Sequence, residues 1–144
     1  SKEHLIGDLH AIANKNFPEM VIEAVVKKFL KLPGYAQPSN GSSYYPLRSS
    51  EDGKIDWYLD DAESISRKIR ALSEPYPGCF SFFEGKKVFF TKAISIDQSF
   101  SGEVAKIYKI KSNKILVSTI KGSISVEYKH EKNLLISRYS YFDK

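Results

Sequence analysis

Apolar residues recur at three- and four-residue steps over the first thirty positions of the chain. One set lies within residues 5–12 and a second within residues 21–29. This spacing is typical of amphipathic helices. Pro18 falls between the two sets and suits the first turn of a new helix, with Asn16 as its candidate cap. We therefore predict two helices whose apolar faces need a packing partner from outside the neighbouring sequence.

A connector without sustained periodicity follows the two predicted helices. Residues 32–54 are dense in Pro, Gly, Ser and Asn, which marks a linker. The predicted linker extends over residues 32–59 and contains several large aromatic residues: Tyr35, Tyr44, Tyr45, Trp57 and Tyr58. Aromatic rings of this size usually bury surface, so we expect the linker to lie against the protein.

A short third helix is predicted next. Asp60 can cap it and Glu63 can reach back to the cap, and the pattern ends before Pro75. Its expected apolar face consists of Ile65, Ile69 and Leu72. Basic residues gather in its later turns, where either the helix dipole or a bound anion would account for them.

The pattern then changes to short runs rich in strand-forming residues. The expected strands cover residues 79–83, 87–91, 103–108, 115–119, 123–128 and 134–141. Glu84-Gly85, Ser112-Asn113 and Lys121-Gly122 supply the turns. One helix followed by five or six short strands predicts an α+β domain over residues 60–144, built as a small OB-like barrel.

Composition and charge narrow the class of protein. Of 144 residues, 42% are hydrophobic and 27% are charged. A membrane-spanning helix needs about 20 consecutive apolar residues, and every apolar run in this sequence is shorter. The chain shows no secretory signal pattern and contains one cysteine, Cys79, so we expect a cytoplasmic protein without a membrane partner. The net charge is +5, and residues 76–144 hold twelve Lys and Arg against six Asp and Glu. That excess fits either a surface that faces a polyanion or ordinary solubility.

Aromatic residues are interleaved with lysines at the start of the predicted barrel, as in surfaces that stack bases and neutralise phosphates. Strand alternation must bury half of these rings, and the candidates for inward positions are Phe80, Phe82, Val88 and Phe90. The candidate polyanion contacts are Lys106, Lys109 and Lys111.

No catalytic or metal-binding pattern is recognisable. The histidines at positions 4, 10 and 130 are not spaced as metal ligands, and one cysteine cannot complete a zinc site. His10 lies at helical spacing beside apolar residues and is interpreted as a surface residue. We predict no catalytic residue and no metal site in this chain.

Two motifs carry more specific information. The connector contains a P-x-R-x-x-E-D-G-x-I-D-W segment, and the third helix ends in I-R-A-L before a P-x-P-G-x-F turn. The residues that carry the motifs are Arg48, Asp52, Gly53, Asp56, Trp57, Arg70, Pro75, Pro77 and Gly78. Together they resemble the linker and C-terminal domain of folate-dependent formyltransferases, with Cys79 where alanine is commoner.

The resemblance implies a domain arrangement. Residues 1–31 resemble the closing helices of an N-terminal formyltransferase domain, residues 32–59 the linker, and residues 60–144 the OB-like C-terminal domain. Such enzymes transfer a formyl group from 10-formyltetrahydrofolate to an amine, using residues in an upstream catalytic domain. None of those residues can be placed in this chain, so the resemblance implies that it holds no cofactor and is inactive alone.

Two acceptors are known for the family. The sequences of the connector and of residues 74–87 are closer to enzymes that formylate an amino-sugar nucleotide, and we expect that acceptor first. The basic barrel favours the alternative, methionyl-tRNA, because an RNA-binding lobe must neutralise phosphates. A stand-alone OB-type binding module is a further alternative, and a homo-oligomer is possible for each.

Overall fold

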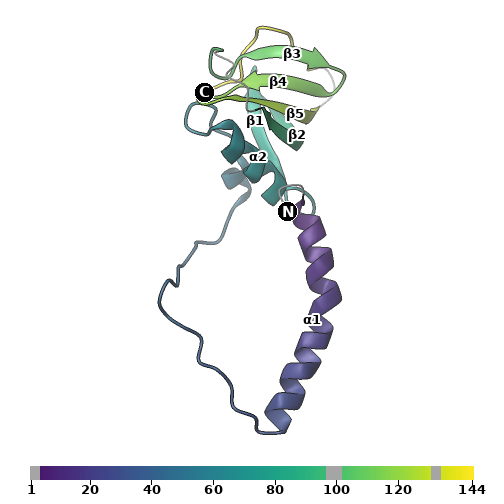
Figure 1. Ribbon diagram of the computed structural model, residues 1–144. Coiled ribbons are helices and arrows are strands. Elements are labelled where there is room, and N and C mark those ends of the chain that lie inside the picture. Colours follow the sequence, from purple (N-terminus) through teal and green to yellow (C-terminus); the bar gives the residue numbers. More distant parts are fainter. Residues whose placement is uncertain (1–3, 97–101, 131–133) are drawn as a thin grey trace.

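A computed structural model of the chain describes residues 4–96, 102–130 and 134–144 (Figure 1). Its helices are α1 (Ile6–Phe29), the 3-10 turn η1 (Ser50–Gly53) and α2 (Ala62–Ala71). Its strands are β1 (Cys79–Phe83), β2 (Lys86–Ile96), β3 (Ile107–Lys111), β4 (Lys114–Ser118) and β5 (Ser123–His130). The predicted α+β class is confirmed.

The five strands form one antiparallel sheet in the order β1-β2-β5-β4-β3. β1 and β2 are joined by Glu84 and Gly85, whose φ angles are +51° and +71°. Two positive φ values in a two-residue loop match the twist of antiparallel strands, which explains why the predicted turn is formed here.

The C-terminal residues connect the two ends of this sheet. Ile107 N donates to Ser140 O at 2.9 Å, and Phe142 N donates to Ala105 O at 3.0 Å. One residue further, Asp143 N donates to the carbonyl of Phe82 in β1 at 2.9 Å. Residues 134–141 were predicted as a strand, but they contribute only an isolated bridge at Tyr141. This closure is consistent with the predicted OB-like fold.

The core lies between the sheet, α2 and the end of the connector. Asp61, rather than the predicted Asp60, caps α2 by accepting from Ser64 N at 2.7 Å. Ile65 and Ile69 of α2 and Trp57 of the connector are nearly inaccessible to solvent. The other core residues are Ile55, Ala62, Cys79, Phe83, Val88, Phe90, Ala105, Ile107, Ile115, Val117, Ile124, Val126, Leu134 and Phe142.

The prediction of two helices divided at Pro18 is wrong. α1 is continuous through Pro18, and the side chain of Asn16 donates to Ile12 O at 2.8 Å instead of capping a second helix. A proline inside a helix costs roughly 3 kcal/mol, partly because one carbonyl loses its donor. The residues around Pro18 are exposed, so water can solvate that carbonyl.

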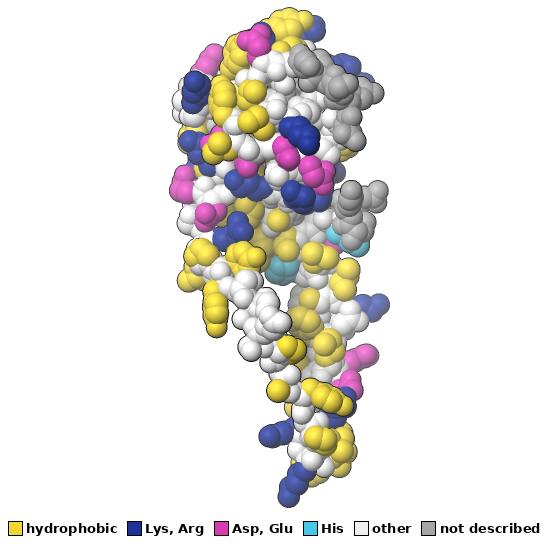
Figure 2. All heavy atoms as spheres, turned by 60° about the vertical axis from the view of Figure 1, so that its left-hand side comes forward, with side chains coloured by type: hydrophobic (Ala, Val, Ile, Leu, Met, Phe, Trp, Pro, Cys, Tyr) yellow, Lys and Arg dark blue, Asp and Glu magenta, His cyan; other side chains and the backbone are white. Residues whose placement is uncertain are grey.

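α1 projects from the barrel and buries no residue (Figure 1). Its exposed large apolar residues are Leu9, Ile12, Phe17, Met20, Val21, Ile22, Val25, Val26 and Phe29. Figure 2 shows hydrophobic side chains along this lower projection of the molecule. The sequence predicted that the apolar faces of this region need a further packing partner, and the exposure of these side chains on α1 agrees with that prediction.

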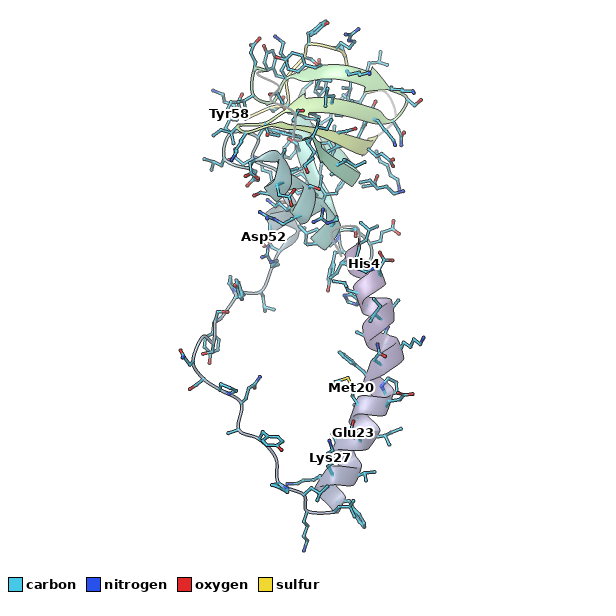
Figure 3. All side chains as sticks on the ribbon, viewed as in Figure 1. His4, Met20, Glu23, Lys27, Asp52 and Tyr58 are labelled. Carbon is cyan, nitrogen blue, oxygen red and sulfur yellow. The ribbon has the colours of Figure 1, made fainter. Side chains whose placement is uncertain are left out.

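The connector does not lie against the protein as predicted. Tyr35 and Leu47 are 101% exposed, and Tyr44 is 96% exposed. The connector returns to the barrel at Asp52, well separated from Met20 and the rest of α1 (Figure 3). Within the described chain, the rings of Tyr35, Tyr44 and Tyr45 remain exposed, and of the large aromatic residues predicted to bury the connector only Trp57, near its end, packs into the core.

Candidate functional site

Four side chains lie together on the outer face of the β1–β2 hairpin. The strand register pairs Phe82 with Lys87 and Phe80 with Phe89. Residues two apart share one face of a strand, so all four face away from the core. The Lys54 side chain joins them from the connector, with its Nζ 5.8 Å from the Phe82 ring centroid. These five residues are called the aromatic–lysine patch.

Two of the predicted inward residues belong to this patch instead. Val88 and Phe90 are core residues, as predicted, whereas Phe80 and Phe82 face the other side of β1, where Phe80 is nevertheless buried at 1% exposure. Ser81 takes the inward position between them, where its Oγ accepts from the indole Nε1 of Trp57 at 2.9 Å. A buried indole N–H needs an acceptor, which accounts for a polar residue pointing into the core.

Lys87 lies at the centre of the patch. Its Nζ is 3.7 Å from the ring centroid of Phe80, 5.7 Å from that of Phe82 and 6.0 Å from that of Phe89. The Glu51 carboxylate is 3.7 Å from this Nζ, but its side chain is 70% exposed, so solvent screens the pair. Phe80 is buried under Lys87, whereas Phe89 is 38% exposed and offers a ring to a ligand.

Two glycines of the family motif let the connector approach β1. A Cβ on Gly53 would lie 2.4 Å from the carbonyl oxygen of Gly78, and Gly78 has a φ of +89°. The approach also positions Ile55 N to donate to Phe80 O at 2.8 Å. Because both backbones are fixed, Lys54 is held beside the outer face of β1.

Two aspartates of the motif shape the connector locally. Asp52 Oδ2 accepts from Ser49 N at 2.6 Å, and this backbone hydrogen bond lowers the pKa of its carboxyl. Asp56 Oδ1 accepts from Tyr58 N at 2.9 Å and Leu59 N at 3.2 Å. Each aspartate therefore stabilises a local turn of the backbone, and the two carboxylates do not form a common binding site.

The remaining motif residues lie around the barrel. Trp57 is a core residue, and Arg48 is exposed on the connector. Arg70 donates to Ser66 Oγ at 3.1 Å within α2. Pro75 follows a cis peptide bond, and Pro77 lines a pocket near Phe89.

That pocket, of about 410 Å³, adjoins the patch. Phe89 and Tyr76 contribute aromatic rings to it, and Lys92 and Lys129 contribute cations. Tyr76 and Lys129 were not singled out from the sequence. The β2–β5 register, which pairs Phe89 with Lys129, could not be read from local pattern.

The predicted polyanion contacts are not equivalent. Lys106 forms an ion pair with Glu103 at 2.5 Å, and its Nζ lies 5.1 Å from the Tyr141 ring centroid. The hydrogen bonds to Glu103 and Tyr141 raise the pKa of Lys106. Lys109 and Lys111 are exposed on β3, which lies at the opposite end of the sheet order from β1.

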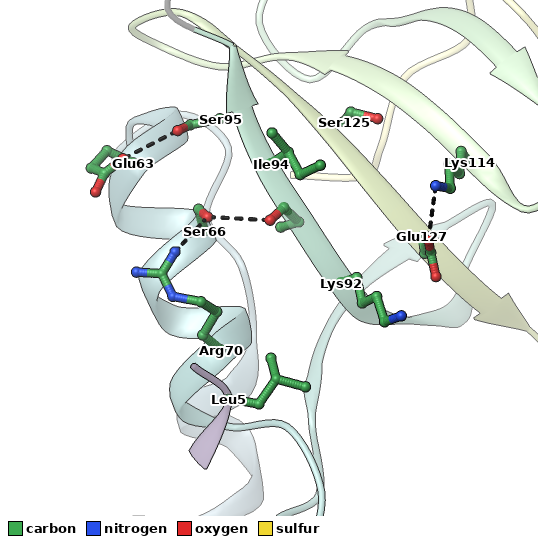
Figure 4. Close-up of a pocket in the computed structure, with 11 residues that line it drawn as sticks. Leu5, Glu63, Ser66, Arg70, Lys92, Ile94, Ser95, Lys114, Ser125 and Glu127 are labelled. Carbon is green, nitrogen blue, oxygen red and sulfur yellow. Dashed lines mark hydrogen bonds and ion pairs between the residues drawn. The ribbon is translucent and has the colours of Figure 1, made fainter. Parts of the chain in front are cut away.

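A second groove, of about 540 Å³, runs between α2 and β2 (Figure 4). Apart from Lys92, its charged residues engage one another or neighbouring hydroxyls. Lys114 pairs with Glu127 at 3.0 Å, and Glu63 accepts from Ser95 Oγ at 3.1 Å. The groove therefore presents mixed charge and no convergent set of catalytic groups.

The described residues contain no group of three His, Cys, Asp or Glu side chains that could hold a metal, and no helix in them could cross a membrane. His10 Nε2 lies 3.3 Å from Tyr76 Oη. Burial raises the pKa of the Cys79 thiol to about 11, which disfavours the nucleophilic thiolate.

A family model and curated relatives both match this chain. A family model described as "Formyl transferase, C-terminal domain" matches residues 48–134. The methionyl-tRNA formyltransferase of Syntrophus aciditrophicus (strain SB) is 28% identical over 141 residues, which cover 95% of this chain and 45% of the relative. That of Dechloromonas aromatica (strain RCB) is 32% identical over 107 residues, which cover 74% of this chain and 33% of the relative. The chain spans less than half the length of these curated relatives.

Solved structures show the same fold. A variant of HypX from Aquifex aeolicus aligns over 85% of this chain and 22% of its own, with a TM-score of 0.60 and 22% identity. HypX in complex with tetrahydrofolic acid aligns over 79% of this chain and 20% of its own, with a TM-score of 0.55 and 23% identity. At this level of identity the likeness is one of fold.

Proposed function

The chain belongs to the formyl transferase C-terminal domain family, and we propose that it is the region of a longer formyltransferase that helps to hold a methionyl-tRNA acceptor. The donor, 10-formyltetrahydrofolate, and the reacting groups would then be held by an upstream catalytic domain. This chain would contribute RNA contacts and no step of the transfer itself.

The aromatic–lysine patch is the observation that carries this proposal. Phe89 offers an exposed ring, Lys87 supplies positive charge 6.0 Å from the centroid of that ring, and Lys54 adds a second positive charge beside Phe82. Bases stack on exposed rings, and lysines displace counterions from the phosphate backbone. The two curated relatives described above are named methionyl-tRNA formyltransferases, which supports the same acceptor.

The amino-sugar acceptor, which the connector sequence favours, predicts a different behaviour. In that case the barrel would serve mainly as a scaffold, and its lysines could be changed without effect on turnover. The two acceptors can therefore be separated by measuring RNA binding.

The direct test is fluorescence anisotropy of a labelled initiator tRNA transcript titrated with the 144-residue chain. We expect an association constant that falls as salt rises from about 50 to 200 mM, with a log–log slope near −2 to −3 for two or three phosphate contacts. Lys87→Glu should weaken binding about tenfold, because it removes a phosphate contact and adds a repulsive charge. Lys28→Glu, which makes the same charge change at an exposed position of α1, should have a smaller effect.

Lys106, Lys109 and Lys111 remain candidates for a second contact. Because Glu103 already neutralises Lys106, Lys106→Ala should weaken tRNA binding less than Lys109→Ala. Undetectable tRNA binding, or binding that does not respond to salt, would contradict a methionyl-tRNA acceptor.

A further inference from the structure

The pocket beside Phe89 is built from four parts of the chain. The start of α1, residues 73–78, the middle of β2 and Lys129 of β5 line it, and it shares Phe89 with the aromatic–lysine patch. Its volume of about 410 Å³ is within the range of roughly 300–1,000 Å³ that is usual for small-ligand sites. The pocket can therefore admit a single nucleotide but not a duplex.

Two aromatic rings line this pocket and remain accessible. Tyr76 is 44% exposed and Phe89 is 38% exposed. The Tyr76 ring contacts His10 edge-on, with 5.8 Å between the ring centroids, and its hydroxyl lies 3.3 Å from the His10 Nε2. These contacts hold the ring in place before a ligand arrives, which lowers the entropy cost of binding.

Charged groups of both signs surround the rings. Lys92 and Lys129 contribute cations to the pocket, with Lys129 paired to Phe89 across β2 and β5. Asp8 and Glu74 also line the pocket. Asp8 Oδ2 accepts from Leu5 N at 2.9 Å, which fixes its carboxylate near the start of α1.

We propose that this pocket binds one unpaired nucleotide of RNA, with the base stacked between Phe89 and Tyr76. The phosphates lie toward Lys129 and Lys92, where positive charge is available. A base within a duplex has both faces covered by its neighbours, so only an unpaired base can use these rings. The inference rests on the proposed RNA acceptor and specifies which part of an RNA the domain holds.

The carboxylates add a preference among bases. A carboxylate accepts hydrogen bonds from the exocyclic amino group of cytosine, and adenine also carries an amino group. Uracil has no exocyclic amino group and can donate to a carboxylate only from its ring N3–H. Asp8 and Glu74 therefore favour cytosine or adenine over uracil in the pocket.

The experiment uses Phe89→Trp in the 144-residue chain as a reporter. The natural Trp57 is 1% exposed, so a ligand cannot stack on it, whereas the introduced tryptophan would lie at the pocket. Labelled RNA octamers of cytidine and of uridine are titrated, along with a blunt RNA duplex, and tryptophan fluorescence and octamer anisotropy are recorded together. We expect saturable quenching by the cytidine octamer, weaker binding of the uridine octamer and little quenching by the duplex.

Substitutions in the natural background test the same rings without a reporter. Phe89→Ala and Tyr76→Ala should each weaken cytidine-octamer binding on the order of tenfold, consistent with the loss of one stacking contact. Tyr35→Ala is the matched control, because it removes an aromatic ring that is fully exposed on the connector. Circular dichroism checks that each variant remains folded.

The outcomes separate this inference from the proposed function. If the octamer binds without quenching the reporter tryptophan and without dependence on Phe89 or Tyr76, the pocket assignment is overturned while tRNA binding through the patch stands. Equal quenching by the duplex would overturn the requirement for an unpaired base, and equal affinity for uridine would overturn the role of the carboxylates. If neither octamer nor tRNA binds, the proposed function fails as well.

Discussion

The indole Nε1 of Trp57 donates a hydrogen bond to Ser81 Oγ across 2.9 Å, and both side chains are 1% exposed. This contact joins the end of the connector to the middle of β1. Because Ser81 faces inward, its neighbours Phe80 and Phe82 must face outward, where they form part of the aromatic–lysine patch. One buried polar contact therefore fixes which face of β1 is available for binding.

Ser81→Ala should destabilise the chain by about 1–3 kcal/mol, because it leaves the buried Trp57 N–H without an acceptor. Urea denaturation followed by circular dichroism measures this loss. A double-mutant cycle with Trp57→Phe isolates the hydrogen bond, since the second change removes the donor and keeps a buried ring. Additive effects of the two changes would show that the contact contributes nothing.

Gly53→Ala should destabilise the chain by about 1–3 kcal/mol, because the new Cβ would be forced against a backbone oxygen. That oxygen belongs to the Gly78 carbonyl and lies 2.4 Å from the position that the new methyl carbon would take. Gly34→Ala is the control, since nothing lies within 4 Å of its Cβ position. A Gly53→Ala chain as stable as the Gly34→Ala chain would disprove the close approach of the connector to β1.

The local elements could be predicted well because their determinants are local. The third helix was expected from Asp60 and ends before Pro75, and α2 occupies Ala62–Ala71. The cap differs by one residue because Asp60 Oδ2 lies 3.4 Å from Asp56 N, leaving Asp61 to serve Ser64 N. Two adjacent aspartates offer the same cap, and only the preceding turn decides between them.

The features that the sequence did not reveal depend on distant residues. Period-two alternation fits either face of β1, and the choice depends on Trp57, 24 positions before Ser81. The pocket depends on the β2–β5 register, which brings Lys129 beside Phe89. α1 is continuous through Pro18, and the exposure that lets water solvate the carbonyl left without a donor cannot be read from the helical pattern.

The Asp61 carboxylate makes stability depend on pH. The Ser64 backbone N–H holds the pKa of Asp61 below its usual value of 3.8. A carboxyl whose folded pKa is lowered stabilises the fold above its unfolded pKa, and that contribution is lost as pH falls through the lower folded value. Asp61→Asn keeps a side-chain acceptor but cannot titrate there.

Thermal unfolding from about pH 7 to pH 2 tests this linkage. The melting temperature of the natural chain should fall more than that of Asp61→Asn as pH drops below about 4, with the largest difference between the two at neutral pH. A difference that stays constant across the whole range would show that Asp61 titrates with its unfolded pKa.

Phe142 provides the most stringent test of how the barrel is closed. It is 2% exposed and stacks on Trp57, with 5.0 Å between ring centroids, and it meets Phe83 and Phe90 edge-on. Its N–H donates to Ala105 O, and the next residue donates to Phe82 O. The Phe142 ring thus packs in the core, while the backbone of residues 142 and 143 forms hydrogen bonds at both ends of the sheet.

Phe142→Ala should cost about 3–5 kcal/mol, as expected for removing a buried ring. That loss is a large part of the roughly 5–15 kcal/mol by which a domain is usually stable, so Phe142→Leu provides a milder change that can be measured in the folded state. Leu135→Ala, at a side chain that is 88% exposed, is the control and should change stability by less than about 0.5 kcal/mol.

If Phe142→Leu loosens the closure, hydrogen exchange should speed up first at the amides of Phe142 and Asp143, which donate to the two ends of the sheet. Unchanged exchange at both amides would mean that the sheet holds its curvature without this segment.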